Sequence, residues 1–446
     1  MGLKKMKTYL MCFLFISGGF FIFNNMDISD LYKIYESCNY EVCTDTRLIQ
    51  KGSLFFALTG ANFNGNNFAN KAISDGCKFA VCDDKSIQGE GIVQVESSLD
   101  ALQQLASFHR AKFDMPFLAI TGSNGKTTTK ELVSHVLNKK YDLLATSGNL
   151  NNHIGVPLTL LKLRKHHDFA LIEMGANKIG DIRELCEIAD PTHGMITNIG
   201  LAHIEGFGSE EGVVVTKTEM YRYIIENKGI LFVNNNEDYL LQYTKDYPHV
   251  IEFGGDDLNF RFDNKSDQLG LIINDNFIAT QLFGKYNANN VLTAYAVGLE
   301  FGVEENSIKE AIEAYAPNNN RSQIKRSKKG NQLILDAYNA NPTSLNLAID
   351  EFLEKEGPKI FIVGDMRELG NVSEREHKSI INKLKNTGCK VYLVGPEFMK
   401  YNSSQIKVFS TVDELIHDDE LSTIKNSNIL IKGSRGVQLE KVESYL

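Results

Sequence analysis

The stretch TGSNGKTTT carries the residue types of a loop that grips phosphate. Gly122 and Gly125 permit tight turns, which lets successive backbone N–H groups point at phosphate oxygens. Lys126 can neutralise the β- and γ-phosphates of a nucleotide, and the hydroxyl of Thr127 can ligate Mg²⁺. The general phosphate-loop motif has a glycine at the position of Ile120, so it is met only in part. Because the loop joins an apolar strand to an amphipathic helix, we expect ATP binding rather than a glycine turn that only caps a helix.

Three segments further along the chain bring metal-ligating residue types to predicted strand and helix ends. Glu173 ends the apolar strand DFALIEM, where doubly wound sheets place ligand-contacting groups. His203 follows another strand in a glycine-flanked loop, and Lys217 stands beside Glu219 at a predicted helix start. Each residue also has an interpretation without a role in metal binding: Glu173 as an exposed strand-end carboxylate, His203 as a surface or core histidine, and Lys217 as a salt-bridged lysine. Together with Thr127, Glu173 and His203 indicate a magnesium site beside the γ-phosphate.

The elements that must position these residues follow a strand–helix rhythm. Residues 26–112 alternate short apolar runs with polar turns and end in the predicted helix SLDALQQLASFHRAKF. Residues 113–316 alternate apolar strands with helices, as a mostly parallel sheet does, and the rhythm restarts over residues 317–446. We predict an α/β fold of three domains: an N-terminal α/β domain, a central mostly parallel sheet with the phosphate loop, and a C-terminal doubly wound, Rossmann-like domain.

Length and charge narrow the classes of protein. The chain has 446 residues, 43% of them hydrophobic and 23% charged, which is globular and too long for one ordinary core. Its formal net charge of −9 argues against sequence-independent binding of nucleic acid. The 7 cysteines are scattered, odd in number and without a C-x-x-C pair. They fit a reducing compartment rather than a disulfide framework.

Residues 1–25 lie outside the domain pattern. Three lysines precede an apolar run, which resembles a signal peptide or a short anchor. No small-residue cleavage site follows, and the run is short for a membrane span of about 20 residues. The sequence leaves open a wrongly chosen start codon, a dispensable extension and a membrane tether with the ATP site on the cytosolic side. Export is not expected, because an ATP-dependent site would find no ATP outside.

Seven motifs, in chain order, resemble the Mur ligase family, the ATP-dependent ligases of peptidoglycan synthesis: TGSNGKTTTKE, GNLNNHIGVPLTLL, LIEMGA, TNIGLAHIEGFGS, DAYNANPTS, GDMRELG and IKGSRG. DAYNANP and GDMRELG are similar to the member that adds D-alanyl-D-alanine. An NP-R motif, expected of the member that adds a diamino acid, is not found in the C-terminal domain. DTRLIQKGSLFFALTGANFNGNNF resembles the domain that holds the UDP-sugar, and the resemblance covers residues 26–446.

The resemblance implies a reaction, its substrates and its cofactors. Such ligases phosphorylate the terminal carboxylate of a UDP-MurNAc-peptide with the γ-phosphate of ATP. The amine of the incoming D-Ala-D-Ala then attacks the acyl phosphate and releases phosphate. The expected cofactors are ATP and Mg²⁺, the expected substrates are UDP-MurNAc-tripeptide and D-Ala-D-Ala, and the expected protein is a cytoplasmic monomer. Membrane contact is expected only if residues 1–25 are a real anchor.

By resemblance, site residues are carried onto this sequence. Lys126, Glu173, His203 and Lys217 are the expected catalytic group; Thr127, Glu173, His203 and, if carbamylated, Lys217 are the expected metal ligands. The expected ATP-binding residues are Gly122, Ser123, Asn124, Gly125, Lys126, Thr127, Thr128, Asn287, Asn290, Arg321 and Asp336. The expected substrate-binding residues are Asp45, Thr46, Arg47, Asn149, Asn151, Asn152, Asn339, Asn341, Lys432, Ser434 and Arg435.

Three positions depart from the family pattern. Tyr286 stands where histidine is frequent, which puts the adenine contacts of that segment in doubt. His153 stands where an acidic or amide residue is common, and Leu335 where many relatives carry a second aspartate. Of these two neighbouring positions, only Asp336 therefore offers a carboxylate for ATP binding.

Rival functions remain to be separated. The nearest is a sister ligase that adds a diamino acid or glutamate to the same nucleotide peptide. A membrane-tethered nucleotide switch, suggested by the apolar N-terminus and the phosphate loop, is less favoured. A catalytically dead scaffold is disfavoured, because every expected metal ligand is present.

Overall fold

The computed structural model describes residues 27–201, 204–255, 260–263, 268–401 and 406–446. The chain forms two compact units, Met1–Phe108 and His109–Leu446, and each is described by itself. The three domain ranges predicted from the sequence stay predictions. Among the described residues, no helix has the length and apolarity to cross a membrane. Residues 1–25, for which the sequence left an anchor open as one alternative, lie outside them.

The first unit is built on a small parallel sheet. Its strand order is β1-β2-β5-β6, and every neighbouring pair is parallel. The strands are β1 (Val42–Cys43), β2 (Leu54–Phe56), β5 (Phe79–Cys82) and β6 (Ile92–Gln94); β3 (Thr59–Gly60) and β4 (Phe63–Asn64) form a separate hairpin. The helices are α1 (Ile28–Ser37) and α2 (Ala69–Ser74), and α3 (Ser98–Arg110) leads into the second unit. The predicted apolar runs of this region are thus confirmed as strands.

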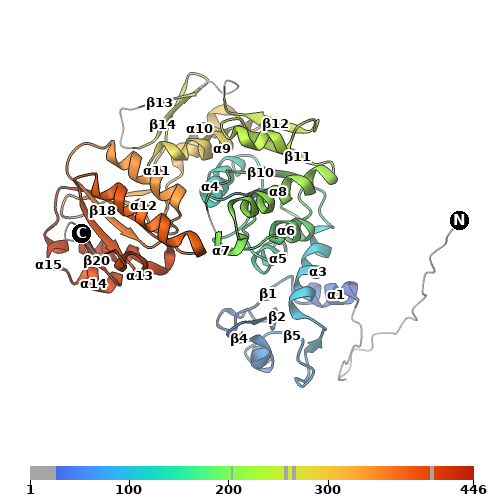
Figure 1. Cartoon of the computed structure of the whole chain (residues 1–446). Coiled ribbons are helices and arrows are strands. Elements are labelled where there is room, and N and C mark those ends of the chain that lie inside the picture. Colours follow the sequence, from blue (N-terminus) through green and yellow to red (C-terminus); the bar gives the residue numbers. More distant parts are fainter. Residues whose placement is uncertain (1–26, 202–203, 256–259, 264–267, 402–405) are drawn as a thin grey trace. The chain divides into compact units, whose positions relative to one another are not determined.

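The second unit begins with a six-stranded, wholly parallel sheet in the order β12-β11-β10-β7-β9-β8 (Figure 1, cyan to green). The strands are β7 (Phe117–Thr121), β8 (Leu143–Ala145), β9 (Phe169–Glu173), β10 (His193–Ile196), β11 (Ile230–Asn234) and β12 (Val250–Phe253). β7 and β9 are buried throughout. Continuous apolar runs such as theirs are typical of strands in a parallel sheet that is covered on both faces. β7 therefore sits inside the sheet and delivers the phosphate loop at its carboxyl end.

Helices cover this central sheet. The helices are α4 (Lys126–Leu137), α5 (Gly155–Leu160), α6 (Asp181–Ala189), α7 (Ile204–Phe207), α8 (Glu210–Glu226), α9 (Ala288–Glu300) and α10 (Glu305–Ala314). One core joins Leu118 and Ile120 of β7 to α4, α9 and α10. It also includes residues of β14 (Gly270–Ile273) and β15 (Asn276–Ala279), which form an antiparallel sheet with β13 (Phe260–Asp263). The sequence predicted a strand in the segment of β15 but not this antiparallel sheet.

One predicted helix start is wrong. α8 begins at Glu210, so Lys217 lies in the middle of the helix. The side chain of Ser209 accepts a hydrogen bond from the backbone N–H of Gly212 and caps the helix. Glu210 and Glu211 then place negative charge in the first turn, where the helix dipole favours it.

The C-terminal part of the second unit carries a doubly wound sheet in the order β16-β17-β21-β18-β19-β20 (Figure 1, orange to red). β16 (Gln323–Arg326) is antiparallel to β17 (Gln332–Asp336); β18 (Lys359–Gly364), β19 (Lys390–Val394), β20 (Lys407–Phe409) and β21 (Asn428–Lys432) run parallel with β17. The helices are α11 (Pro342–Leu353), α12 (Ser373–Lys385), α13 (Pro396–Met399), α14 (Val412–Ile416) and α15 (Asp419–Thr423).

Alternate residues of these strands supply two separate cores. Phe361 and Val363 of β18 pack with α11 and α12, whereas Ile360 and Ile362 pack with α14 and α15. This alternation follows from the two-residue period of a strand. The predicted doubly wound domain is confirmed. The loops that follow its strands at their carboxyl ends carry the predicted ligase residues.

Candidate active site

The phosphate loop needs glycine at both predicted positions. Gly122 has φ +142° and Gly125 has φ +81°, in the region that L side chains rarely adopt. A Cβ on Gly122 would lie 2.0 Å from the Oγ1 of Thr197, and one on Gly125 would lie 2.5 Å from the Oδ1 of Asn290. The close approach of two distant segments therefore reserves these positions for glycine. Helix α4 starts directly after the loop, at Lys126.

The amine of Lys126 lies over the loop. Its Nζ donates hydrogen bonds to the carbonyl oxygens of Gly122 (2.6 Å) and Ser123 (3.2 Å). Burial lowers the pKa of Lys126 to about 8, against a smaller opposing effect of the Glu173 carboxylate. The loop thus carries a cation beside the backbone N–H groups at the start of α4, which suits a polyphosphate.

Glu173 is the buried carboxylate at the end of β9. It is 1% exposed, and its Oε1 accepts hydrogen bonds from Thr127 Oγ1 (3.2 Å) and Asn151 Nδ2 (2.8 Å). Its Oε2 is buried without a hydrogen-bond partner in the described part of the chain, with Lys130 Nζ 3.8 Å away. An oxygen left in this state beside a threonine hydroxyl has the chemistry of a ligand for a hard divalent cation.

Lys217 is a buried amine without a counter-charge in hydrogen-bond reach. It is 1% exposed, and its Nζ has no hydrogen-bond partner among the described residues; the ring of Phe207 lies 5.5 Å from it. Burial, reinforced by the nearby charge of Lys126, holds the pKa of Lys217 well below its usual value. The amine is therefore neutral far more readily than an exposed lysine.

The simpler interpretation of Lys217, a salt bridge to Glu219, is not what the structure has. Glu219 instead accepts hydrogen bonds from the backbone N–H groups of Gly180 (2.8 Å) and Arg183 (2.9 Å) at the start of α6. His203, the predicted third metal-site residue, lies outside the described residues.

A cavity of about 750 Å³ gathers most of the predicted ATP and substrate residues; we call it the phosphate-loop cavity. The predicted residues that line it are Ser123, Asn124, Gly125, Lys126, Thr127, Thr128, Asn149, Asn151, Asn152, Glu173, Asn287, Asn290, Arg321, Asp336, Asn339, Asn341 and Lys432. Gly122, Lys217, Ser434 and Arg435 are not among the lining residues. Segments from the phosphate loop to the end of β21 thus meet around one space.

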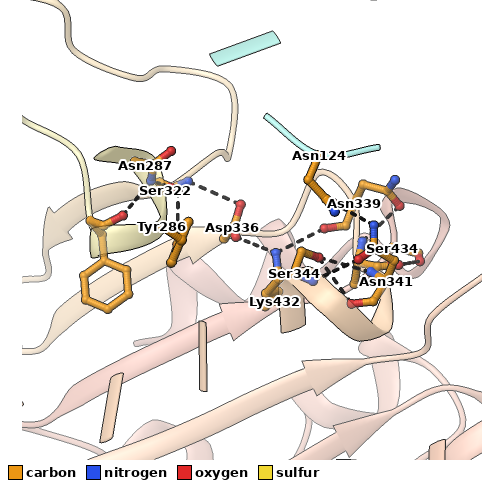
Figure 2. A network of polar contacts seen from close by, with 12 residues as sticks. Asn124, Tyr286, Asn287, Ser322, Asp336, Asn339, Asn341, Ser344, Lys432 and Ser434 are labelled. Atoms are coloured by element: carbon orange, nitrogen blue, oxygen red, sulfur yellow. Dashed lines mark hydrogen bonds and ion pairs between the residues drawn. The ribbon is translucent and has the colours of Figure 1, made fainter. Parts of the chain in front are cut away.

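A chain of hydrogen bonds links helix α4 to the C-terminal sheet along this cavity. Thr129 Oγ1 donates to Asn290 Oδ1 (3.0 Å), and Asn290 Nδ2 donates to Asn287 Oδ1 (2.8 Å). Asn287 Nδ2 donates to Ser322 Oγ (3.1 Å), and the Ser322 N–H donates to Asp336 Oδ1 (3.3 Å), as Figure 2 shows for the last two steps. The two predicted asparagines therefore belong to a network that spans both sheets.

Tyr286, the departure from the family pattern, joins the same network. Its hydroxyl lies 3.3 Å from Ser322 Oγ, and burial raises the pKa of the phenol well above its usual value. Ser322 itself has φ +49°, a conformation that non-glycine residues seldom take. Such positions are held by their surroundings, here by contacts to Asn287 and Asp336.

Asp336 and Lys432 form a buried ion pair at neighbouring strand ends. Asp336 ends β17, Lys432 ends β21, and the two residues are direct partners in the sheet. Lys432 Nζ donates to Asp336 Oδ2 and lies 3.4 Å from the carbonyl oxygen of Asn339 (Figure 2). Lys432 is 2% exposed, so it is not part of a solvated cationic loop.

Two guanidinium groups share one tyrosine ring. The guanidinium of Arg321 lies 3.6 Å from the ring centroid of Tyr338, and that of Arg435 lies 5.2 Å from it. Tyr338 lines the phosphate-loop cavity. Stacking on an aromatic face holds guanidinium groups in place, and Arg321, which lines the cavity, gives this wall a positive character suited to anions.

Asn341 connects helix α11 to the phosphate loop. Its Oδ1 accepts from the N–H of Ser344 (2.9 Å) and completes a capping box, whereas its Nδ2 donates to Asn124 Oδ1 (2.7 Å; Figure 2). Ser434 holds the neighbouring loop, because its Oγ accepts from the N–H of Arg367 (2.9 Å). These contacts make Asn341 and Ser434 positioning groups.

The predicted uridine-side residues lie in the first unit. Asp45 accepts hydrogen bonds from the backbone N–H of Arg47 (2.9 Å) and from its guanidinium, and Thr46 lies between them in a short 3₁₀ turn. The hydrogen bond from the Arg47 side chain lowers the pKa of Asp45 to about 2. Asp45 and Arg47 thus form an ion pair within this turn, on the surface of the first unit.

Sequence reasoning missed several residues of the phosphate-loop cavity. Besides Tyr338 these include Asp181, Glu184, Asn198, Glu237, Tyr239, Thr343, Ser344 and Glu368. Tyr338, Thr343 and Ser344 stand inside the quoted motif DAYNANPTS, Asn198 inside TNIGLAHIEGFGS and Glu368 inside GDMRELG, so the motifs themselves marked these positions. The others follow strands or begin helices, and nothing in their local sequence separates them from ordinary turns.

Comparison with known protein families gives three matches along the chain. Residues 40–110 match the family model described as Mur ligase family, catalytic domain. Residues 120–298 match the Mur ligase middle domain, and residues 320–435 match the Mur ligase, glutamate ligase domain.

Individual relatives cover nearly the whole chain. The UDP-N-acetylmuramoyl-tripeptide–D-alanyl-D-alanine ligase of Bacillus subtilis is 31% identical, over 90% of this chain and 92% of the relative. A crystal structure of MurF from Acinetobacter baumannii has a TM-score of 0.80 at 30% identity, covering 91% of this chain and 92% of that one. The MurF ligase from Thermotoga maritima in complex with ADP has a TM-score of 0.80 at 26% identity, covering 92% and 97%.

Proposed function

The chain belongs to the Mur ligase family, and from this premise we propose that it joins D-alanyl-D-alanine to UDP-N-acetylmuramoyl-tripeptide, with conversion of ATP to ADP and phosphate. The product is a precursor of peptidoglycan. The observation that carries the proposal is the phosphate-loop cavity, which brings the loop, Glu173 and the residues of DAYNANP around one space. That arrangement suits a reaction between a nucleotide, a carboxylate and an amine.

ATP binds the loop in this proposal, and Mg²⁺ binds beside it. Support for the metal comes from Glu173 Oε2, a buried carboxylate oxygen without a hydrogen-bond partner among the described residues, next to the hydroxyl of Thr127. Thr127 and Glu173 would hold the ion, with His203 as a further ligand. The ion would neutralise charge between the γ-phosphate and the substrate carboxylate, whose mutual repulsion otherwise opposes their meeting.

The chain's own residues support the two chemical steps. A carboxylate is a poor electrophile, so its phosphorylation supplies a leaving group for the attacking amine. Lys126 and the N–H groups of the loop stabilise the phosphate as it transfers and as it leaves. Arg321, stacked on Tyr338 at 3.6 Å, brings a second cation to the same cavity.

Lys217 takes a different role, as a carbamate. Its amine, which has no hydrogen-bond partner among the described residues and a lowered pKa, adds CO₂ with loss of a proton, which turns a buried base into an anion that can bind a second cation. Carbamate formation removes the free-energy cost of burying an amine that has no hydrogen-bond partner among the described residues. It also adds negative charge near the cation of Lys126.

Substrate residues divide between the units. Asn149, Asn151 and Asn152 hold the peptide of the nucleotide, and Asn339 and Asn341 help to position the dipeptide. Asp45, Thr46 and Arg47 contact the uridine side. Ser434 and Arg435 act from the loop that follows β21. We place the reaction of a monomer in the cytoplasm, where ATP is available.

A phosphate-release assay tests the function. Purified protein with ATP, Mg²⁺, UDP-MurNAc-tripeptide and D-Ala-D-Ala should release phosphate and form the pentapeptide product, detected by mass. Omission of either peptide substrate should stop steady turnover. Phosphate release stimulated only by a diamino acid or by glutamate would instead assign the chain to a sister ligase, and nucleotide binding without any ligation would indicate a switch.

A further inference from the structure

A second loop braces the phosphate loop: residues 197–200, which follow β10 and which we call the β10 loop. The side chain of Asn198 pairs with both backbone groups of Asn124, accepting from its N–H (3.0 Å) and donating to its carbonyl oxygen (3.0 Å). The hydroxyl of Ser123 accepts from the N–H of Gly200 (2.9 Å) and donates to the carbonyl oxygen of the same residue (3.0 Å). The conformation of the phosphate loop therefore depends on where the β10 loop lies.

The middle of the β10 loop is held by a phenol. The backbone N–H of Ile199 donates to the hydroxyl of Tyr239 (2.7 Å), which lies in the 3₁₀ helix η3 (Asp238–Tyr243) after β11. The β10 loop forms no helix or strand, so a side chain satisfies this N–H instead of a backbone ladder. Ile199 stands between Asn198 and Gly200, the two residues that contact the phosphate loop. The tyrosine hydroxyl thus fixes the loop between its two contact points.

Glu237 sets the direction of the Tyr239 hydroxyl. The hydroxyl donates to Glu237 Oε2 (2.6 Å), and Oε1 of the same carboxylate accepts from Asn289 Nδ2 (3.1 Å). A phenol has one proton, and once the carboxylate accepts it, the oxygen is left as an acceptor for the N–H of Ile199. Asn289 is fixed in turn, because its Oδ1 accepts from Asn236 Nδ2 (3.1 Å). Every donor in this network therefore points along the chain of contacts toward the carboxylate.

This network lies at the wall of the phosphate-loop cavity. Ile199, Glu237, Tyr239 and Asn289 all line the cavity, and Glu237 and Tyr239 are half-buried. Burial, reinforced by Glu237, raises the pKa of the Tyr239 phenol, so the hydroxyl keeps the proton that it donates. None of these residues was expected from the sequence to bind ATP or substrate. Their contacts nevertheless lead directly to the loop that grips phosphate.

We propose that Tyr239 is a positioning residue for the nucleotide: its hydroxyl, oriented by Glu237, holds the β10 loop and thereby keeps the phosphate loop in the conformation that receives the triphosphate. The assignment rests on the proposed ligase function and deepens it, because it names groups that shape the ATP site from outside the phosphate loop. Such groups matter because a displacement of about 1 Å at a reacting centre can lower a rate by about 100-fold.

Hydrogen exchange tests the contact itself, in the protein without substrates. Tyr239→Phe removes only the hydroxyl, and the amide of Ile199 should then exchange about 10-fold faster, as expected when one hydrogen bond that holds a loop is lost. Mass spectrometry of peptides that contain residues 197–200 measures this rate. Tyr247→Phe is the matched control: its hydroxyl donates to the carbonyl oxygen of Gly229 (2.6 Å), and neither residue lines the cavity. Exchange of the β10 loop should be unchanged in this control.

Steady-state kinetics tests the consequence for ATP. Tyr239→Phe should lower kcat/KM for ATP by about 10-fold and leave the KM for UDP-MurNAc-tripeptide and for D-Ala-D-Ala unchanged. Glu237→Gln should lower it by about 3-fold, because an amide keeps only one acceptor oxygen. The double variant Tyr239→Phe/Glu237→Gln should be no worse than Tyr239→Phe, since Glu237 acts through the hydroxyl. Tyr247→Phe should lose a similar amount of Tm and keep the wild-type kcat/KM.

Wild-type exchange of the β10 loop in Tyr239→Phe overturns the assignment. An equal loss of kcat/KM in Tyr247→Phe also overturns it, because the loss would then follow stability alone. An additive loss in the double variant overturns the orienting role of Glu237.

If Tyr239→Phe does not fold, Glu237→Gln decides: wild-type exchange of the β10 loop together with wild-type kcat/KM for ATP overturns the assignment. A wild-type protein that ligates nothing overturns the proposed function instead. The exchange rates and the affinity for ATP, measured by calorimetry, then still decide the role of Tyr239, so the two failures are distinct.

Discussion

Two cavities of the second unit treat charge in opposite ways. In the phosphate-loop cavity, Glu173 and Lys432 are at most 2% exposed, and Glu173 carries a carboxylate oxygen without a hydrogen-bond partner in the described residues. In a second cavity, of about 1280 Å³ at the carboxyl ends of β18, β19 and β20, Lys400 and Lys441 form exposed ion pairs. Surface pairs contribute little to stability, whereas buried charges are costly unless a ligand or partner satisfies them. Buried titratable groups with shifted pKa values therefore indicate where the reaction takes place, whereas exposed charged groups suit the recognition of a ligand.

The largest expected effect comes from the phosphate loop. Lys126→Ala should lower phosphate release by roughly 1,000-fold, because it removes a preorganised cation from the site of charge transfer. Lys139→Ala, close to the other end of the same helix and in an exposed ion pair with Glu310, serves as the control and should keep near-normal turnover. Circular dichroism should be unchanged for both. Retained turnover in Lys126→Ala would mean that the nucleotide binds elsewhere.

The buried amine gives the second test. Lys217→Met should lower turnover by about 100-fold, yet raise the Tm at pH 7, because an apolar side chain replaces a buried amine that has no hydrogen-bond partner among the described residues.

The effect on stability should depend on pH. The folded-state pKa of Lys217 is depressed, so the unfolded chain binds the extra proton, and wild-type stability rises with pH toward the unfolded pKa of about 10.4. The Tm advantage of Lys217→Met should therefore shrink from pH 7 to pH 9 in CO₂-free buffer. An advantage that grows with pH contradicts the assignment of a neutral buried amine.

The buried ion pair gives the third test. Lys432→Met leaves the carboxylate of Asp336 buried and unpaired, and should destabilise the protein by about 3–5 kcal/mol. The double variant Asp336→Asn/Lys432→Met should regain much of the lost Tm but not the affinity for ATP. Calorimetry of unfolding and of ATP binding separates the two effects, and additive losses in the double variant would rule out a coupled pair.

The smallest effect is expected at Asn341. Asn341→Ala removes both the cap of α11 and the contact to Asn124, and should cost about 1 kcal/mol of stability and several-fold in turnover. Asn341→Asp keeps a capping oxygen but has no donor for Asn124 Oδ1. It should keep the Tm and lose only turnover; equal turnover in Asn341→Asp and the wild type would make the asparagine a cap alone.

Much of the fold could be predicted, since apolar runs of strand length alternate with helical patterns over most of the chain. The start of α8 was misplaced, because the capping role of Ser209 was overlooked among the short polar residues before the helix. The sequence predicted a strand at DNFIATQLF, which β15 (Asn276–Ala279) confirms, but not its antiparallel pairing with β14, because the local pattern of one strand does not set the direction of its neighbours. The local sequence pattern is a poor predictor of a strand that is stabilised mainly by the core on which it packs.

The sequence by itself determined which chemical groups are available and where along the chain they fall: a glycine-bordered lysine after an apolar strand, a carboxylate at a strand end, and motifs that place the chain in its family. Only the tertiary structure decided which of them meet. Asn290 reaches Gly125 and Lys432 pairs with Asp336, although these residues come from segments far apart in sequence, and Lys217 finds no hydrogen-bond partner in the part of the chain that the structure describes. The physical reason is that desolvation and hydrogen bonding depend on distances of a few ångströms, which the packing of sheets and helices sets and a linear order of residues does not.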